Sequence, residues 1–312
     1  MKTILVAGGA GFIGSNLVDA LLAEGNQVVC IDNFFIGTRE NIAHLKDNEN
    51  FKLYEQDLAD LVALKQVFAA EKIDYVFHMA ANSDIQASAA APEVEYKNTY
   101  TTTFNILECM RLYGVKNLFF CSTSAVYGDA LGAEVNENYA PLEPISYYGA
   151  CKLGSEALIS AFSYMNNFKS LVFRFPNVIG PRLTHGVIFD FMKRLRENPA
   201  ELTILGDGRQ CKPYLYVKDL VDCIMQFKDN LPEGVTLYNV GGHTQSTVTG
   251  IAEIVCREMG LKDVKFSYTG GRGGWKGDVP VFAYNLDKIH TAGWQAGLSS
   301  DEAVAQTVRD VL

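Results

Sequence analysis

The chain has 312 residues, of which 48% are hydrophobic and 20% charged, and its formal net charge is −9. This composition is typical of a soluble globular protein with one large domain or two joined ones, and no apolar run is long enough for a membrane span. The negative charge argues against nucleic acid or an anionic membrane as a partner. The seven scattered cysteines contain no Cys-x-x-Cys pair, which argues against a disulfide framework or a zinc site. We therefore expect a cytoplasmic protein that holds no metal.

The stretch from Ile4 to Gly14 reads ILVAGGAGFIG. Its apolar start suits a strand buried on both faces, and Gly8, Gly11 and Gly14 follow at the spacing of a phosphate-binding turn that opens into a helix. Gly8 would allow the sharp turn, and Gly11 would let backbone N–H groups approach a pyrophosphate. Ordinary strand-turn-helix corners also use glycine, so the flanking sequence has to decide between the two.

The flanking sequence favours a dinucleotide site. Apolar residues recur at helical spacing from Ile13 to Leu22, and Gly25-Asn26 ends that helix. The next strand, 27–31, leads to Asp32, whose carboxylate can accept both hydroxyls of an adenosine ribose. That acid favours NAD over NADP because it would repel a 2′-phosphate. The alternative is a plain α/β corner with a solvated Asp32.

Alternating elements continue along the chain after Asp32. We predict a loop and short helix over 33–50, a strand over 51–56, helix 61–70, strand 75–78 and a long helix over 92–113. Asp57 is either an adenine contact or, like Asp60, a helix cap. The small residues after strand 75–78 suit close passage of a cofactor, and His78 is interpreted as a packed core histidine.

A strand over 117–121 ends in Ser122-Thr123-Ser124, and a helix starts near Tyr147 after a proline-containing loop. The repeated β-α pattern through Phe175 predicts a Rossmann-type, doubly wound parallel α/β sheet. Beyond Phe175, prolines and glycines break the pattern and a smaller mixed α/β unit is expected. We therefore divide the chain into a dinucleotide-binding domain, 1–175 with a later contribution from about 212–240, and a substrate-binding domain, 176–312.

Four helices are expected in the later part of the chain, over 188–198, 220–227, 248–259 and near the C-terminus. The last of these should begin with a capping box formed by Ser299 and Glu302. Strands are expected over 214–217, 236–240 and 265–268, with a turn at 206–208 and a glycine loop at 270–274.

Tyr148 and Lys152 are the residues best placed for chemistry. They lie four apart at the start of the predicted helix, so both side chains project from one face. A neighbouring ammonium lowers the pKa of a phenol, and Tyr148 would then act as a base. Two other Tyr-Lys pairs have this spacing, at 214/218 and 284/288, but only Tyr148 follows a strand that ends in hydroxyl residues. Thr123 is the preferred hydroxyl partner, with Ser122 and Ser124 as alternatives.

These motifs together resemble the extended short-chain dehydrogenase/reductase family, in its NAD-dependent nucleotide-sugar epimerase/dehydratase branch. The resemblance covers nearly the whole chain and rests on GxxGxxG at 8–14, Asp32-Asn33, Asp57-Leu58, HMAA at 78–81, Asn98, STSAVYG at 122–128, Tyr148 with Lys152, and RFPN at 174–177. It implies a tightly held NAD, a nucleoside-diphosphate sugar in the cleft between domains, and a homodimer formed through the helices at 92–113 and 147–165.

The resemblance also assigns residues to roles. The catalytic residues would be Thr123, Tyr148 and Lys152. The cofactor-binding residues would be Gly8, Gly11, Phe12, Ile13, Gly14, Asp32, Asn33, Asp57, Leu58, Met79, Ala80, Ala81, Asn98, Ser122, Tyr148, Lys152 and Phe175. The substrate-binding residues would be Ser83, Thr123, Asn177, Val187, Phe191, Lys212, Tyr216 and Asp278.

Two positions depart from the family pattern. Lys212 stands where the family usually has an arginine, and Trp275 stands where a motif ending at Asp278 usually begins with arginine. A lysine cannot grip a phosphate bidentately, so another arginine would have to hold the diphosphate. The candidates are Arg182, Arg209 and Arg272, and a solvated turn residue is the alternative for Lys212.

The residues after Thr123 narrow the reaction. Dehydratases of this branch carry an acid pair there and decarboxylases one glutamate, whereas this chain has Ser124 and Ala125. The resemblance therefore favours 4-epimerisation of the UDP-glucose/UDP-galactose type through a 4-keto sugar. The alternatives are a nucleotide-sugar 4-dehydrogenase or reductase, which would use the same three residues, and a non-catalytic NAD-binding protein on this fold.

Overall fold

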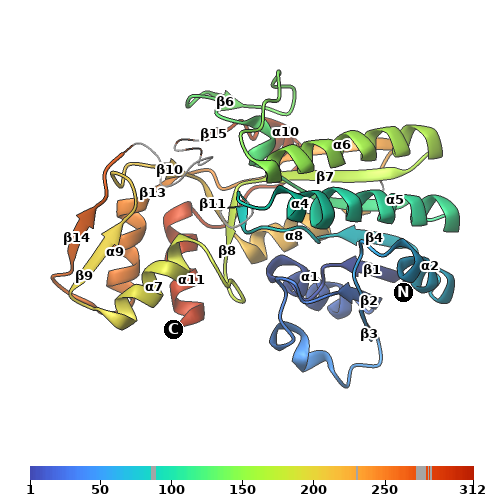
Figure 1. Ribbon diagram of the computed structural model, residues 1–312, viewed down its shortest axis with the longest axis horizontal. Coiled ribbons are helices and arrows are strands. Elements are labelled where there is room, and N and C mark those ends of the chain that lie inside the picture. The colour runs from blue at the N-terminus through green and yellow to red at the C-terminus, as the bar shows by residue number, and fades with distance from the viewer. Residues whose placement is uncertain (86–88, 230, 272–278, 280, 282) are drawn as a thin grey trace. The chain divides into compact units, whose positions relative to one another are not determined.

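The structure is a computed structural model, and it describes residues 1–85, 89–229, 231–271, 279, 281 and 283–312. The chain forms two compact units, shown in Figure 1. The first contains Met1–Val126, Ser146–Arg174 and Val221–Tyr238, and the second contains Tyr127–Ile145, Phe175–Leu220 and Asn239–Leu312. Residues 127–145, which we expected in the first domain, group with the second unit, because hydrogen bonds such as Tyr127 Oη to Asn239 Oδ1 join them to its later segments. The binding roles of the two domains stay predictions.

The first unit is built from alternating strands and helices. Its strands are β1 (Thr3–Ala7), β2 (Gln27–Asp32), β3 (Phe51–Glu55), β4 (Tyr75–His78), β5 (Asn117–Thr123), β7 (Lys169–Phe175) and β12 (Gly234–Asn239). Its helices are α1 (Phe12–Ala23), α2 (Leu61–Ala70), α4 (Pro92–Glu95), α5 (Thr102–Tyr113) and α6 (Tyr147–Asn166), with short turns η1 (Glu40–Leu45) and η3 (Ser124–Tyr127). Helix α8 (Val217–Phe227) spans the boundary of the two units.

The seven strands form one sheet in the order β12-β7-β5-β4-β1-β2-β3. The pairs β1/β2, β2/β3, β1/β4 and β4/β5 are all parallel. From β1 to β3, each new strand is added on one side of β1. From β4 onward, the new strands are added on its other side, so the direction of the strand order reverses between β1 and β4. Ligands of such sheets bind at the carboxyl ends of the strands at this switch point. The predicted Rossmann-type architecture is confirmed.

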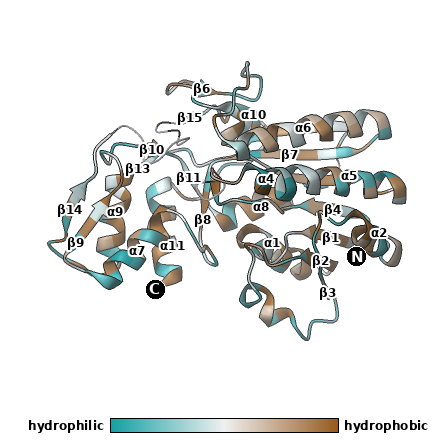
Figure 2. Ribbon diagram, in the orientation of Figure 1, coloured by the Kyte–Doolittle hydropathy of each residue, from teal (hydrophilic) through white to brown (hydrophobic). Residues whose placement is uncertain are grey.

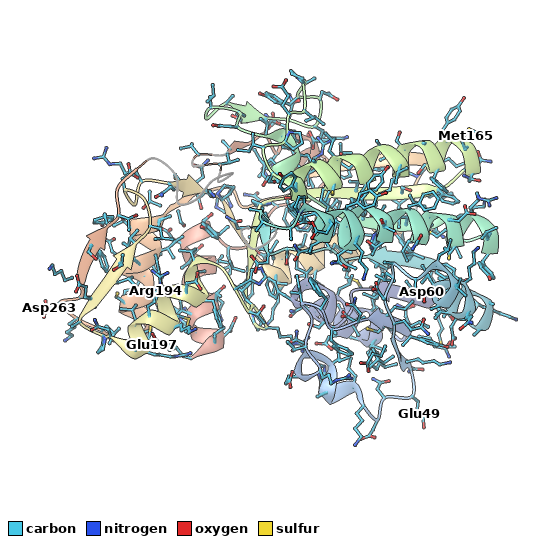
Figure 3. The ribbon with its side chains drawn as sticks, viewed as in Figure 1. Glu49, Asp60, Met165, Arg194, Glu197 and Asp263 are labelled. Carbon is cyan, nitrogen blue, oxygen red and sulfur yellow. The ribbon has the colours of Figure 1, made fainter. Side chains whose placement is uncertain are left out.

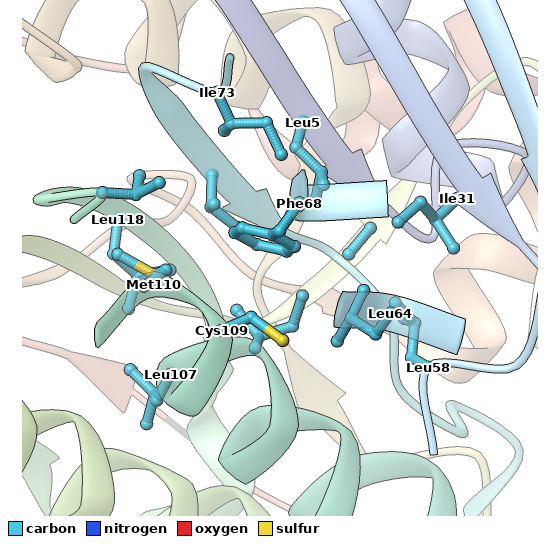
Figure 4. Packing of buried hydrophobic residues seen from close by; sticks show 14 of the residues in the cluster. Leu5, Ile31, Leu58, Leu64, Phe68, Ile73, Leu107, Cys109, Met110 and Leu118 are labelled. Atoms are coloured by element: carbon cyan, nitrogen blue, oxygen red, sulfur yellow. The ribbon is translucent and has the colours of Figure 1, made fainter. Parts of the chain in front are cut away.

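The core of the first unit lies between the sheet and helices α2 and α5. Leu5 and Ile31 from β1 and β2 face Leu64 and Phe68 from α2, and all four are at most 3% exposed. Figure 4 shows the Phe68 ring between Leu5 of the sheet and Cys109 and Met110 of α5. Four consecutive apolar residues at Ile4 to Ala7 are buried because helices cover both faces of a parallel sheet.

The helix predicted over 92–113 is present, but a wider turn interrupts it. The π-helical segment η2 (Tyr96–Thr101) separates α4 from α5. The Thr99 carbonyl accepts hydrogen bonds from the hydroxyls of Thr102 at 3.2 Å and Thr103 at 2.8 Å, which stabilise the widened turn. Such turns contain one extra residue and occur often at functional sites.

The second unit combines short strands with helices. Its strands are β6 (Glu134–Val135), β8 (Asn177–Ile179), β9 (Glu201–Ile204), β10 (Cys211–Lys212), β11 (Tyr214–Tyr216), β13 (Ser246–Thr247), β14 (Lys265–Tyr268) and β15 (Ala283–Tyr284). Its helices are α7 (Val187–Glu197), α9 (Val248–Glu258), α10 (Asp287–Thr291) and α11 (Ser300–Val311). Figure 2 shows hydrophilic and hydrophobic residues side by side along α7 and α11, as amphipathic helices require.

The capping box predicted at the start of the last helix is confirmed, because the Ser299 and Glu302 side chains each hydrogen-bond the other's backbone N–H group. Strands β6, β8, β10, β13 and β15 were not predicted, because segments of two or three residues show too few alternations for a pattern. The four-residue strand β9 was also missed. No helix within the described residues is long and apolar enough to cross a membrane.

Candidate active site

The loop between β1 and α1 has the shape of a phosphate-binding turn. Gly8 adopts a left-handed conformation with φ +82°, and a Cβ atom on Gly14 would lie 2.1 Å from the Gly8 carbonyl oxygen. Only glycine therefore lets α1 begin this close to the strand. The N-cap position, Gly11, provides no side-chain cap, and the first turn carries no acidic residue. The positive end of the helix is thus available to an anion.

The segment after β4 lies directly against this turn. A Cβ atom on Gly8 would lie 2.7 Å from the Ala80 backbone, and the Met79 and Ala80 N–H groups both donate to the Ala7 carbonyl at 2.9 Å. The structure therefore brings the predicted cofactor segments 8–14 and 79–81 together at the switch point of the sheet. His78, just before them, is fully buried with Nε2 3.0 Å from Thr103 Oγ1, which confirms its interpretation as a packed histidine.

Asp32 is the last residue of β2 and only 6% exposed. Its Oδ2 accepts the Ala10 N–H at 2.9 Å and its Oδ1 accepts the Phe34 N–H at 2.8 Å. Burial raises the pKa of this carboxyl, and the two backbone hydrogen bonds lower it. A carboxylate has about four acceptor positions, so Asp32 retains capacity for ribose hydroxyls beside the turn. Asn33, the next residue, accepts the Phe35 N–H through Oδ1.

Asp57 and Asp60 have different roles. Asp60 caps α2 by accepting the Val62 and Ala63 N–H groups. Asp57 accepts the Ala59 N–H at 2.9 Å and pairs with Lys97 of η2 at 2.8 Å. Burial raises the pKa of Asp57, but the Lys97 and Ala59 contacts outweigh it and the net direction is downward. The capping interpretation thus holds for Asp60, and an adenine contact of Asp57 stays a prediction.

The catalytic candidates meet at the end of β5. Ser146 caps α6 by accepting the Gly149 N–H at 3.1 Å, which places Tyr148 in the first turn of the helix. Thr123, the last residue of β5, accepts the Ala125 N–H through Oγ1 at 3.1 Å and hydrogen-bonds the Tyr148 side chain. Thr123 therefore bonds Tyr148, and its catalytic role stays a prediction.

Lys152 lies one helical turn further along α6 and is 1% exposed. Its Nζ donates to the Cys121 carbonyl of β5 at 2.6 Å and lies 4.6 Å from the Phe120 ring centroid and 5.8 Å from that of Tyr148. Burial lowers the pKa of Lys152 to about 8, although the charges of neighbouring groups raise it. Its remaining N–H groups can donate to a ligand, since an ammonium has three.

The expected lowering of the Tyr148 pKa is wrong for the protein alone. Burial is the largest cause and raises the pKa of the phenol, the charges of Cys121 and Glu95 raise it further, and only the hydrogen bond with Thr123 lowers it. The expectation considered Lys152 and a positive nicotinamide ring, and neglected the cost of burying a phenolate.

Sequence reasoning missed a buried ion pair behind Ser122. Arg174 of β7 binds Glu156 of α6 bidentately, with distances of 3.0 Å from Nε and 2.6 Å from Nη2. The Ser122 hydroxyl donates to the same carboxylate. Ser122 therefore positions Glu156, and a direct cofactor contact of Ser122 stays a prediction. The available signal in the sequence was the spacing of Glu156 four residues after Lys152, which places both side chains on one face of the helix.

The other predicted residues lie in both units. Asn98 is half-buried in η2, and Ser83 is exposed five residues after β4. Phe175 ends β7 at 8% exposure, and Leu58 is part of the core. The substrate candidates Asn177, Val187, Phe191, Lys212 and Tyr216 lie in β8, α7, β10 and β11. Asp278, with Trp275 and Arg272, lies outside the described residues.

Two of these substrate candidates are already engaged within the second unit. The Tyr216 hydroxyl donates to Asp310 Oδ2 of α11 at 2.5 Å, and Phe191 is 4% exposed in the core. Asn177 pairs in register with Tyr214 between the parallel strands β8 and β11. Contacts of these residues with a substrate stay predictions.

A phosphate-binding turn, an acid at the end of the second strand, and a tyrosine and lysine one turn apart beside a threonine define a nicotinamide-dependent enzyme of the short-chain type. Residues 4–241 match the NAD dependent epimerase/dehydratase family. The chain belongs to that family, its cofactor is NAD, and the resemblance seen in the sequence is confirmed. The glycine turn, the uncapped start of α1 and Asp32 fit this dinucleotide.

Three proteins illustrate the similarity. The UDP-glucuronate 4-epimerase of Thermodesulfobacterium geofontis is 32% identical over 317 residues, covering 99% of this chain and 95% of that protein. A crystal structure of UDP-galactose 4-epimerase is 37% identical with a TM-score of 0.86, covering 99% and 98% of the two chains. The UDP-glucose 4-epimerase of Thermus thermophilus in complex with NAD is 30% identical with a TM-score of 0.87 and the same coverage.

Replacing Gly14 by Ala should destabilise the protein. The new Cβ would lie 2.1 Å from the Gly8 carbonyl oxygen, so we expect the free energy of unfolding to fall by about 1–3 kcal/mol and less NAD to copurify. Denaturant titration and NAD content measure the two effects. Gly297→Ala is the control, because its Cβ would lie 3.4 Å from Asp219 Oδ1 at ordinary contact distance. Equal stability of the two variants would contradict the predicted clash.

Turnover should fall as the pH rises through about 8, because Lys152 is charged below that pH and neutral above it. Lys152→Met has no charge at any pH, so it should be slow throughout and lack this alkaline fall. Profiles of kcat/KM between pH 6 and pH 10 test this. Lys193→Met, at an exposed position of α7, should keep the fall. A fall near pH 8 that persists in Lys152→Met would show that another group titrates.

Proposed function

We propose that the protein is an NAD-dependent epimerase that inverts the 4-hydroxyl of a nucleoside-diphosphate sugar, most simply between UDP-glucose and UDP-galactose. The observation that carries the proposal is the convergence of the Thr123 hydroxyl, the Tyr148 phenol and the Lys152 ammonium at the end of β5. The similarity to 4-epimerases over nearly the full length of the chain supports it.

Each of the three residues has a distinct task in this proposal. Tyr148 removes the proton from the sugar 4-hydroxyl and later returns it to the 4-keto oxygen. Thr123 donates a hydrogen bond to the same oxygen. The Lys152 ammonium, which donates a hydrogen bond to the Cys121 carbonyl, provides a positive charge near the phenol. When bound, NAD would supply the hydride acceptor for oxidation of the sugar C4 and the hydride source for reduction of the 4-keto sugar on its other face. No net oxidation results, so the reaction consumes no cofactor.

The residues after Thr123 support epimerisation over the other reactions of the family. Ser124 and Ala125 begin the short turn η3 directly after the strand that carries Thr123. Neither side chain can deliver a proton as a carboxylic acid does, which elimination of water from the sugar would require. Decarboxylation is likewise disfavoured, because the family's glutamate is missing at this place.

Incubation with a panel of UDP-, GDP-, CDP- and dTDP-sugars tests the proposal. We expect one pair of C4 epimers to interconvert to equilibrium without added cofactor and without absorbance in the NADH band. Accumulation of NADH would instead identify a nucleotide-sugar dehydrogenase, and consumption of added NADH a reductase. Tyr148→Phe should lose about 10²- to 10⁴-fold in turnover with unchanged NAD content.

Tyr147→Phe is the matched control, since Tyr147 is the neighbouring residue and 51% exposed. It should turn over at the normal rate. No reaction with any sugar of the panel would favour a non-catalytic NAD-binding protein, and normal turnover in Tyr148→Phe would reject Tyr148 as the base.

We also propose a homodimer formed through one face of α5 and α6. The two helices lie side by side in Figure 1 and share an edge-to-face contact between Phe104 and Phe162. Phe104 is nevertheless 41% exposed, and Tyr164 and Met165 at the end of α6 are 85% and 76% exposed. Met165 points away from the unit in Figure 3. Exposed apolar surface of this kind is typical of an interface between protein chains.

A charge on the exposed face of α6 tests the dimer. Ala157→Arg should convert the dimer to a monomer, because an unpaired guanidinium would be buried at the interface. Sedimentation velocity measures the mass in solution. Ala69→Arg makes the same substitution at an exposed position of α2 and should leave the mass unchanged. A wild-type monomer, or a dimer in Ala157→Arg, would contradict this interface.

The cytoplasmic location expected from the sequence stays a prediction.

A further inference from the structure

Helix α6 is bound to the end of β5 at three successive turns. The helix residues are four apart, and their partners are three consecutive residues of the strand. The contacts are those of Tyr148 with Thr123, of Lys152 with the Cys121 carbonyl, and of Glu156 with the Ser122 hydroxyl. Residues four apart lie on one face of a helix, so a single face of α6 is held against the strand end. The first two contacts belong to the catalytic candidates, and the third has no assigned role.

The third contact is part of a buried ion pair that joins three elements of the first unit. Glu156 of α6 accepts hydrogen bonds from Arg174 of β7, from Nε at 3.0 Å and from Nη2 at 2.6 Å, in addition to the one from Ser122 of β5. The side chains of Glu156 and Arg174 are only 11% and 5% exposed. Strands β5 and β7 are neighbours in the sheet, so these three residues, the Glu156 cluster, bind the helix to two adjacent strands.

Stability alone does not explain a charged pair at this place. Removing two charges from water costs free energy that their attraction only partly returns, and apolar side chains of similar volume are often as stable or more so. What an ion pair adds is geometry, because a guanidinium and a carboxylate meet as two planar forks in a fixed orientation. Buried polar contacts are known best for setting the register of packed elements.

The Lys152 contact alone leaves the direction of α6 open. An ammonium on a four-carbon stem is a point charge with rotatable donors, so its bond to the Cys121 carbonyl tolerates a tilt of the helix. The planar contact of Glu156 with Arg174 lies one turn further along α6. Two contacts one turn apart fix the direction of the helix, and with it the place of Tyr148 one turn before Lys152.

A second buried acid of the same unit provides a contrast. Glu95 ends α4 and is 0% exposed, and it accepts hydrogen bonds from Asn82 Nδ2 at 2.9 Å and from Thr99 Oγ1 at 3.0 Å. These bonds come from neutral groups and join α4 to the segment after β4 and to η2. Those of Glu156 join α6 to β5 and β7. Of these two acids, Glu156 is therefore the one bonded to the strand that carries Thr123.

We propose that the residues of the Glu156 cluster are positioning residues, which hold α6 in the orientation that places the Tyr148 phenol against Thr123 and the sugar 4-hydroxyl. The proposal rests on the function proposed above, because it assumes that Tyr148 is the base. A catalytic group displaced by about 1 Å can lose about 10²-fold in rate. The sugar contacts predicted in β8, α7 and β10 lie on other elements, so the loss should appear in kcat and leave KM nearly unchanged.

The test replaces the ion pair by an apolar pair. Glu156→Met with Arg174→Met leaves no charge unpaired, so this double variant should unfold at the wild-type denaturant concentration or higher. Its kcat should nevertheless fall by about 10-fold or more, with KM within about 3-fold of the wild type, because α6 is no longer fixed. Wild-type kcat in the folded double variant would overturn the proposal, and so would a rise in KM without a fall in kcat.

A single variant keeps the test available if the apolar pair does not fold. Glu156→Gln retains one oxygen for Ser122 and loses the second half of the fork to Arg174, so it should also lower kcat with KM nearly unchanged. The matched control is Glu258→Gln in the second unit. Glu258 of α9 accepts from Arg309 of α11 in the same two-point way, from Nε at 2.8 Å and from Nη2 at 3.2 Å. The control should keep wild-type kcat, and an equal loss in both variants would overturn the proposal.

A double-mutant cycle shows whether the cluster acts through Tyr148. In the Tyr148→Phe background the base is absent, so its position no longer matters. Adding the two methionines there should cause little further loss of turnover. A general defect of the fold would lower turnover by the same factor in both backgrounds, and that result would overturn the proposal.

The free energy of unfolding, measured on the protein purified with its NAD, gives a readout independent of the sugar reaction. The coupling of Thr123→Val with Tyr148→Phe in this free energy reports their contact. The coupling should be present in the otherwise wild-type protein and lost in Glu156→Gln. If no nucleotide sugar reacts but the coupling is lost, the proposed function fails and the positioning by Glu156 stands. If sugars react and both the coupling and kcat persist in Glu156→Gln, the positioning fails alone.

Discussion

The buried hydrogen bond from Lys152 Nζ to the Cys121 carbonyl is the constraint on which the rest of the site depends. A charge placed among core residues must have a fixed partner, and here that partner is the backbone near the end of β5. The bond fixes the position of α6 along β5. The helical period then places Tyr148 one turn before Lys152, beside Thr123. The tyrosine, the lysine and the threonine are therefore aligned by the fold before any ligand arrives.

Burial is the largest cause of the pKa shifts of both Tyr148 and Lys152. Lys152, Glu95, Glu156 and Arg174 are all largely removed from water, where each charge acts strongly on its neighbours. Arg174 neutralises Glu156 through a bidentate contact, whereas the hydrogen bonds described for Glu95 come from the neutral groups of Asn82 and Thr99. The charges of both acids raise the pKa of Lys152, against the effect of burial.

The sequence was informative where function depends on local spacing. The glycine turn, Asp32 at the end of β2 and the Tyr148–Lys152 pair could be predicted, because each is set by a few neighbouring residues in one element. The burial of Glu95 could not be predicted, since it differs from the exposed Glu93 only in the face of α4 that it occupies. The pKa direction of Tyr148 was wrong for a related reason, because burial is a property of the folded core and leaves no local pattern.

The extra residue in η2 has a consequence for how the buried site around Glu95 can change. A plain α-helix advances by about 100° per residue, so the loss of one residue within η2 would rotate α4 by that angle relative to α5. Glu95 would then leave its buried site and another side chain would replace it, while the helix that packs on the sheet stayed unchanged. Loss of one residue in η2 would therefore exchange the side chain that bonds Asn82, without any change in the residues Thr123, Tyr148 and Lys152 themselves.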